Sequence, residues 1–141
     1  LVQANGVFVM EDCYNANPDS MRAALLTLRD MPVRGSRIAV LADMLELGAL
    51  SDEAHRAVGR LAAECGVQCL LTYGKAARLT AAAAEEAGVP YVQQLETHRE
   101  IADWLRINTR PGDYVLVKGS HGMALEKVLE AFYQGKDVVP C

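Results

Sequence analysis

The chain reads Glu11-Asp12-Cys13-Tyr14-Asn15-Ala16-Asn17-Pro18-Asp19-Ser20-Met21 between an apolar run and a helix-like segment. The apolar run, residues 7–10, predicts a buried strand, and the apolar spacing over residues 21–31 predicts a helix. Asn17 is a favourable N-cap, and Pro18 suits the first helical position because an amide there would have no partner. The stretch therefore predicts a strand, a polar loop and a helix. In open α/β sheets ligands bind at such a loop, and helix N-terminal amides favour anions.

The rest of the chain repeats this alternation. An Asn5-Gly6 turn joins the first two strands. Further strands are expected at residues 1–4, 37–42, 67–72, 91–92 and 114–117, and further helices from Ser51, as a cap, to about Gly66 and over residues 76–87, 98–107 and 123–133. The alternation predicts an α/β fold in one domain over residues 1–141. We expect a Rossmann-like three-layer sandwich, with a mostly parallel sheet of about six strands and helices on both faces.

Composition excludes several functional classes. The chain of 141 residues is 51% hydrophobic and 23% charged, as globular proteins are, and its net charge of −4 offers no basic surface for nucleic acid. No apolar run approaches the roughly 20 residues that span a bilayer, and the first residues do not have the pattern of a signal peptide. We expect a soluble monomer. The start at Leu1, directly in a strand, predicts a piece of a longer protein.

The four cysteines do not predict a metal site. Cys65 and Cys69 are the only close pair, at the end of a predicted helix and before a strand, and neither Cys13 nor Cys141 lies in a second pair. A structural zinc site needs two such pairs of ligands. We expect free thiols in a reducing compartment, the cytoplasm.

Polar residues follow three of the predicted strands, at 12–17, 43–46 and 118–121. Because the carboxyl ends of parallel strands lie along one edge, we expect these clusters to meet there. Lys118 and the Gly-Ser-His-Gly loop after it offer a cation, a hydroxyl and free amides, which can hold a carboxylate or phosphate. The chain contains neither the phosphate-binding pattern G-x-x-x-x-G-K-[ST] nor a nucleophile elbow. Ordinary capped turns have the same composition.

Three motifs carry a resemblance to a known family. The string Asp-x-Tyr-Asn-Ala-Asn-Pro-x-Ser-Met over residues 12–21 resembles the signature that opens the C-terminal domain of the Mur ligases. Residues 41–48 resemble the family's Leu-Gly-Asp-Met-Leu-Glu-Leu-Gly, with Ala42 in place of glycine, and His55 follows at the family's spacing. Residues 117–120 resemble Val-Lys-Gly-Ser, after which His121 replaces the family's arginine. The resemblance spans essentially the whole chain and is greatest to the ligases that add D-alanyl-D-alanine.

The resemblance implies a three-domain ligase in the bacterial cytoplasm that builds peptidoglycan precursors. An N-terminal domain holds UDP-N-acetylmuramoyl-tripeptide, and a central domain binds ATP and Mg²⁺. The C-terminal domain presents the D-alanyl-D-alanine dipeptide, whose amine attacks an acyl phosphate. Only the C-terminal domain matches this chain, so no cofactor and no activity are expected of the chain alone.

By the same resemblance, the candidate site residues fall into three groups. Those expected to face ATP or the reaction intermediate are Asp12, Asn15 and Asn17. Those expected to face the dipeptide are Lys118, Ser120 and His121. Tyr14, Asp43 and Glu46 are expected to pack or to shape the loops.

Two other classes of function remain open. A phosphoacceptor receiver domain has an acidic pocket and a lysine, which Asp12, Asp43 and Lys118 resemble, although Asp43 follows the second long strand instead of the third. A plain α/β ligand-binding module would use the same edge. His55 is otherwise a lone histidine on a helix, either structural or exposed.

Overall fold

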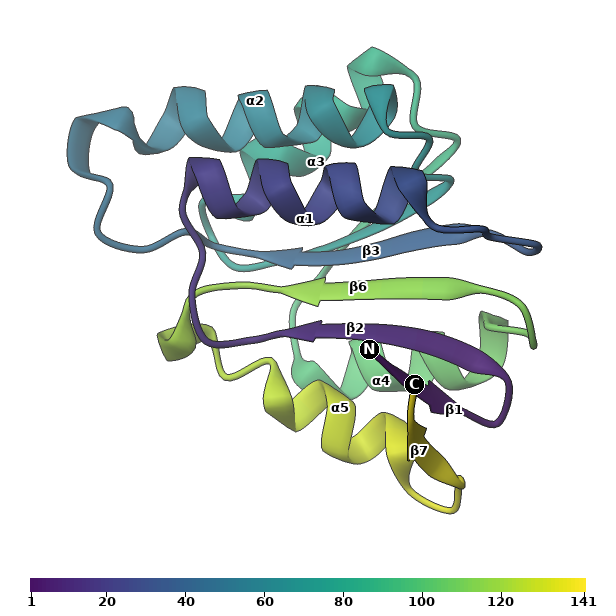
Figure 1. Ribbon diagram of the computed structural model, residues 1–141. Helices are drawn as coiled ribbons and strands as arrows, with labels where there is room; N and C mark the ends of the chain where they lie inside the picture. The colour runs from purple at the N-terminus through teal and green to yellow at the C-terminus, as the bar shows by residue number, and fades with distance from the viewer.

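A seven-stranded sheet runs through the middle of the computed structural model, which describes every residue from Leu1 to Cys141 (Figure 1). The strands are β1 Val2–Ala4, β2 Val7–Asp12, β3 Arg37–Ala42, β4 Cys69–Tyr73, β5 Tyr91–Leu95, β6 Tyr114–Lys118 and β7 Val138–Pro140. The helices are α1 Pro18–Asp30, α2 Ser51–Glu64, α3 Ala77–Ala87, α4 His98–Asn108 and α5 Glu126–Tyr133, with 3₁₀ turns η1 Gly48–Leu50 and η2 His121–Met123.

The strand order is β5-β4-β3-β6-β2-β1-β7. The five strands from β5 to β2 are parallel, whereas β1 is antiparallel to both of its neighbours. The mixed, mostly parallel sheet is therefore confirmed, and it has one strand more than expected. The additional strand, β7, is three residues long and ends in a proline, so its pattern resembles that of a loop.

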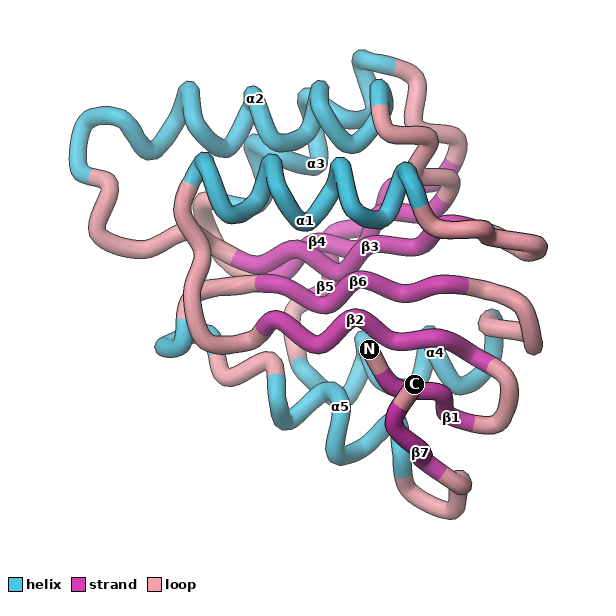
Figure 2. The backbone as a smooth tube through the Cα atoms, in the orientation of Figure 1, coloured by secondary structure: helices cyan, strands magenta, loops and turns pink.

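The helices form a layer on each face of the sheet (Figures 1 and 2). Helices α1, α2 and α3 cover one face, and α4 and α5 cover the other. Each connection from β2 to β5 moves towards the β5 edge, and each later connection moves back. Because strand–helix–strand crossovers are right-handed, reversing the direction moves the helix to the opposite face. The predicted three-layer sandwich follows from this rule.

Apolar side chains fill both interfaces between the sheet and its helices. One core cluster of 18 residues includes Ile101 of α4 and Phe132 of α5, and the other, of 17, includes Leu25 of α1 and Val58 of α2. Because the two clusters are nearly equal, the central strands are covered on both sides, and all five residues of β6 are buried. Burial on both faces explains the continuous apolar runs of the sequence.

Local signals place the helix starts with mixed success. Asn17 and Ser20 form a reciprocal capping box before α1, with Ser20 N donating to Asn17 Oδ1 at 2.8 Å, so the predicted cap is confirmed. The predicted serine cap of α2 is wrong, because η1 leads straight into the helix and Ser51 is already helical. The last helix begins at Glu126 instead of residue 123, because Ala124 takes a left-handed conformation with φ 53°.

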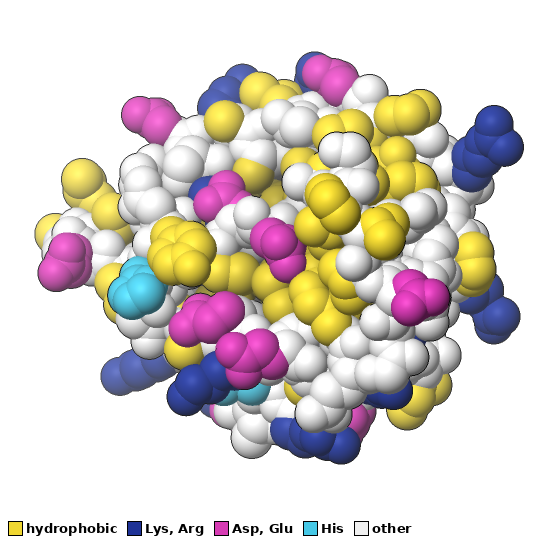
Figure 3. Space-filling view, turned by 60° about the horizontal axis from the view of Figure 1, so that its bottom comes forward, with side chains coloured by type: hydrophobic (Ala, Val, Ile, Leu, Met, Phe, Trp, Pro, Cys, Tyr) yellow, Lys and Arg dark blue, Asp and Glu magenta, His cyan; other side chains and the backbone are white.

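Strands β1 and β7 form one lateral edge of the sheet, on the side of the molecule where α5 lies. In Figure 3 this side comes forward, and hydrophobic side chains gather near its middle with acidic ones among them. Leu1, Val138 and Val139 are among the exposed hydrophobic residues of the chain. No helix has both the length and the apolar character needed to cross a membrane.

Candidate functional site at the carboxyl ends of the strands

The topology brings three exit loops together around β6. This strand lies between β2 and β3. The chain leaves β2 and β3 towards the α1–α2 layer, but leaves β6 towards α5, so neighbouring loops diverge to opposite faces. Such a reversal is where open α/β sheets form ligand sites. We call the three loops, residues 12–17, 43–48 and 118–122, the rim.

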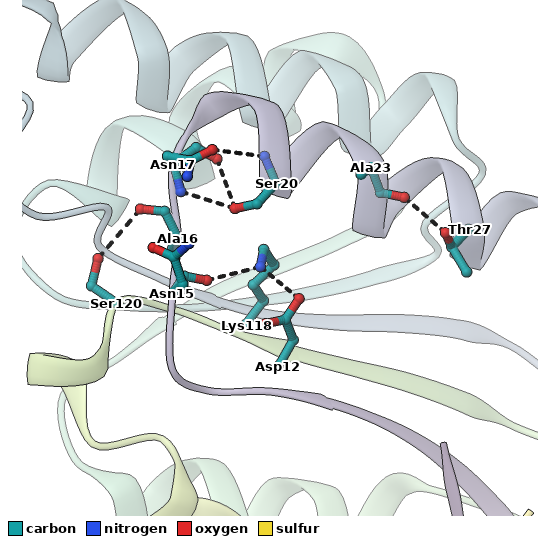
Figure 4. A network of polar contacts seen from close by, with 9 residues as sticks. All are labelled: Asp12, Asn15, Ala16, Asn17, Ser20, Ala23, Thr27, Lys118 and Ser120. Atoms are coloured by element: carbon teal, nitrogen blue, oxygen red, sulfur yellow. Dashed lines mark hydrogen bonds and ion pairs between the residues drawn. The ribbon is translucent and has the colours of Figure 1, made fainter.

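An ion pair links the loops that follow β2 and β6. The Lys118 ammonium donates to Asp12 Oδ2 at 2.6 Å and to the Asn15 carbonyl at 2.8 Å (Figure 4). The lysine side chain is only 1% exposed, whereas the Asp12 side chain is 44% exposed. The cation is thus held below the surface by two acceptors, and the carboxylate that it supports reaches solvent. This pairing offsets the cost of burying the charge.

Ser120 joins all three loops through one hydroxyl group. Its Oγ accepts from Leu45 N at 2.9 Å and lies 3.5 Å from the Ala16 carbonyl, to which it donates. Its backbone N–H donates to the Asp43 carbonyl at 3.2 Å. The preceding Gly119 allows this approach, because a Cβ there would lie 2.7 Å from the Ala42 Cβ.

Asp43 and Glu46 occupy different environments on the β3 exit loop. Asp43 is 8% exposed, and its carboxylate accepts from Ala76 N at 3.2 Å and Ala77 N at 2.7 Å, at the N-terminus of α3. Its charge therefore caps the helix and complements its dipole. Glu46 is exposed in a left-handed turn, with φ 65°.

Aromatic rings from two loops form the outer surface of the rim. The rings of Tyr14 and His121 stack with their centroids 5.6 Å apart and an interplanar angle of 12°. Tyr14 is 74% exposed, and His121 and Asn15 are exposed as well. The side chain of Asn17 is turned towards Ser20 in the capping box (Figure 4).

Burial and acidic neighbours control the ionisable groups beside Asp12. Burial, followed by the charges of Glu126 and Glu11, raises the pKa of the Cys13 thiol to about 11. Burial and the hydrogen bond that Tyr133 donates to Glu11, at 2.6 Å, raise the pKa of the phenol as well. Both groups therefore stay protonated at neutral pH, and Cys13 does not supply a thiolate nucleophile.

Two surface hollows adjoin the rim. One, of about 430 Å³, lies between α1 and the sheet, and Asp12 and Ser20 line its polar end. The other, of about 560 Å³, lies beyond β4, and its charged lining residues are Lys75, Arg78 and Glu96, of which the last two form an ion pair. Nowhere does the chain gather three or more histidine, cysteine or acidic side chains that could hold a metal ion.

The structure thus brings together the sequence-predicted residues of all three loops, with direct contacts among Asp12, Asn15 and Lys118. It also decides between the two interpretations of His55, structural or exposed, that the sequence left open. His55 of α2 is 1% exposed and accepts a hydrogen bond from Met44 N. His55 is therefore structural, and its family spacing after residues 41–48 was the signal in the sequence.

Comparison with known proteins assigns the family. The family model "Mur ligase, glutamate ligase domain" matches residues 1–121 of this chain. The chain belongs to the Mur ligase family. A UDP-N-acetylmuramoyl-tripeptide–D-alanyl-D-alanine ligase of Bacillus subtilis is 32% identical to this Mur ligase domain over 130 residues, which cover 89% of this chain and 28% of that protein. The chain therefore spans little more than a quarter of the length of this curated relative.

Solved structures agree with this assignment. The MurF of Acinetobacter baumannii superposes on this Mur ligase domain with a TM-score of 0.81 and 26% identity, covering 94% of this chain and 29% of that one. The MurF ligase of Thermotoga maritima, solved in complex with ADP, gives a TM-score of 0.75 and 27% identity over the same shares. The chain thus has the fold of the C-terminal domain of these ligases.

The environment of Asp43 argues against the receiver-domain alternative. A phosphoacceptor carboxylate must be accessible, but both oxygens of Asp43 accept hydrogen bonds from the first amides of α3. The acidic residue that a receiver would phosphorylate is a helix cap in this Mur ligase domain.

Proposed function

We propose that this chain is the C-terminal domain of an ATP-dependent ligase that joins D-alanyl-D-alanine to UDP-N-acetylmuramoyl-tripeptide through an acyl phosphate. The enzyme would act in the bacterial cytoplasm, in peptidoglycan precursor synthesis. The observation that carries the proposal is the rim, whose three family motifs meet at one edge of the sheet. Relatives named for this activity match the chain over most of its length.

One half of the rim is proposed to face ATP and the intermediate. Asp12 and Asn15 present a carboxylate and an amide at the surface, and Asn17 lies at the first turn of α1. A carboxylate can accept hydrogen bonds from ribose hydroxyl groups, and helix N-terminal amides favour phosphate. Mg²⁺ and the phosphate-binding loop are assigned to the central domain, because the chain contains no such loop. Phosphoryl transfer depends on positioning and charge stabilisation, which a closing domain can complete.

The other half is proposed to face the dipeptide. A dipeptide presents an amine, which must reach the acyl phosphate, and a carboxylate, which needs a donor. His121 is the exposed donor beside Lys118 and Ser120, and it occupies the position of the family's arginine. A ring N–H of the imidazole can donate a hydrogen bond to a carboxylate. Tyr14 supports the ring from one side.

A reconstituted reaction tests the proposal. A ligase that carries this chain as its C-terminal domain should release phosphate from ATP only when both the UDP-linked tripeptide and D-alanyl-D-alanine are present, and should form one amide bond per phosphate. D-Glutamate is the matched control, because it supplies an amine and a carboxylate without the dipeptide. Turnover with D-glutamate and none with the dipeptide would refute the proposed substrate. The chain alone should release no phosphate from ATP.

A further inference from the structure

We propose that His55 is a positioning residue, which holds the backbone of Asp43–Leu45 in place and through it the loop that carries Lys118 and Ser120. The contact between His55 and this loop is a property of the chain itself. Its consequence for catalysis rests on the function proposed above.

The hydrogen bonds of His55 determine its tautomer. Met44 N lies 3.0 Å from Nε2, and because an amide can only donate, Nε2 must accept. Nδ1 lies 2.7 Å from the Ser51 carbonyl, which can only accept, so Nδ1 carries the proton. The Ser51 hydroxyl is also within 3.2 Å of Nδ1. The imidazole is therefore neutral and connects the start of α2 with the β3 exit loop.

Three consecutive residues of the β3 exit loop are bound to three different elements. The Asp43 carboxylate is bound to the start of α3. The Met44 amide is bound to His55 of α2. The Leu45 amide donates to Ser120 Oγ in the β6 exit loop, and Ser120 N donates back to the Asp43 carbonyl. The Met44 contact lies between the two bonds to Ser120, so its loss would disturb both.

Helix α2, which carries the imidazole, is held firmly against α3. Gly59, one turn after His55, packs against α3, and a Cβ there would lie 2.3 Å from the Thr80 carbonyl. The Thr80 hydroxyl in turn donates to the His55 carbonyl at 2.9 Å. His55 is thus anchored through its backbone to α3 while its ring holds the loop.

The chain itself provides the first test. The ¹⁵N spectrum of the unmodified chain should show His55 neutral and protonated at Nδ1, and protonation at Nε2 would overturn the proposal. In the variants, H55L should speed exchange of the Met44 amide at least ten-fold relative to core amides. H55Q, whose side-chain oxygen can take the place of Nε2, should keep exchange within about three-fold of the wild type. Unchanged exchange in H55L would contradict the proposed contact.

A matched control separates positioning from general stability. T80V removes a buried hydrogen bond to the same helix but leaves the His55 ring in place. It should lower the stability of the chain without raising Met44 exchange relative to core amides. Selective acceleration at Met44 in T80V would show that the loop responds to any weakening of α2, which would overturn a specific role for the imidazole.

The second test uses the ligase that carries this chain. H55L should raise KM for D-alanyl-D-alanine about ten-fold and change KM for ATP less than two-fold, and H55Q should restore most of the dipeptide affinity. An equal rise in both KM values, or no rescue by glutamine, would overturn the positioning role. If the wild-type ligase does not use the dipeptide, the proposed function fails, while the amide-exchange results still decide whether His55 holds the loop.

Discussion

The sheet has one edge at which the parallel strands begin, the amino-end edge, and one at which they end, the carboxyl-end edge. Both contain buried charged side chains, but the roles of these side chains differ. At the amino-end edge, Asp113 is 6% exposed and accepts from Ser36 N at 2.8 Å and Arg110 N at 2.9 Å. The Arg37 guanidinium there donates to three carbonyls at and beyond the end of α1. At the carboxyl-end edge, Lys118 pairs with a second charged side chain, which reaches solvent.

The difference indicates which polar residues serve stability alone. Each charged group at the amino-end edge satisfies backbone atoms of loops and helix ends, as folding requires. At the rim, Lys118 pairs with Asp12 and Tyr14 stacks on His121, and of these four side chains all except that of Lys118 reach solvent. An arrangement that leaves a supported carboxylate at the surface adds little to stability and is available to a ligand.

Replacing Lys118 should produce the largest effect of these substitutions, and that effect should be on catalytic activity. K118M keeps the length of the buried stem and removes the ammonium that supports Asp12. We expect kcat/KM of the ligase to fall at least about 100-fold, as for the loss of one preorganised charge contact. The free energy of unfolding of the chain should fall only by about 1–2 kcal/mol, because the freed Asp12 carboxylate can be hydrated. Steady-state kinetics and urea titration measure the two quantities, and near-wild-type turnover would remove Lys118 from the site.

Replacing Asp113 should show the opposite pattern. D113A leaves the amides of Ser36 and Arg110 without their acceptor, and we expect it to destabilise the chain by about 2–3 kcal/mol. The ligase activity below the unfolding temperature should stay within two-fold of the wild type. D113N, which retains one acceptor oxygen, should cost less. A large loss of turnover in D113A with little loss of stability would contradict the claim that charged residues at the amino-end edge serve stability alone.

The smallest effects should come from two helix caps with equal roles in folding. Asn17 caps α1 within the rim, and Thr97 caps α4 by accepting from Glu100 N at 3.0 Å. Replacement of either by alanine should lower the free energy of unfolding by about 1 kcal/mol. Only N17A should also lower turnover of the ligase, about ten-fold, because only Asn17 is proposed to face the intermediate. Equal kinetics in N17A and T97A would assign Asn17 to capping alone.

Much of the fold, and the place of the rim within it, could be predicted from the sequence. The period of the apolar residues predicts the order of strands and helices, and the crossover rule then brings the three polar loops to one edge. The cap at Asn17 follows from contacts within four residues. Local pattern thus gave both the layers of the fold and the location of the rim.

The individual contacts within the rim could not be predicted from the sequence. Ser120 and Leu45 are 75 residues apart, and Asp43 caps a helix that begins 34 residues later. No periodicity encodes which amide a hydroxyl or carboxylate will meet. For this reason the sequence left His55 as either structural or exposed, and β7 was missed because its pairing with β1 supplies what its short sequence lacks.

The hydroxyl of Ser120 has a consequence for how a ligand is received. Because it ties together loops from three separate strand ends, neither the β2 exit loop nor the β3 exit loop can change conformation without breaking a contact to Ser120 in the β6 exit loop. Preorganisation of this kind means that the conformational entropy of these loops is lost during folding and not again on association. In the proposed ligase, domain closure would then carry the rim as a rigid body, and the hinge would lie outside the rim residues.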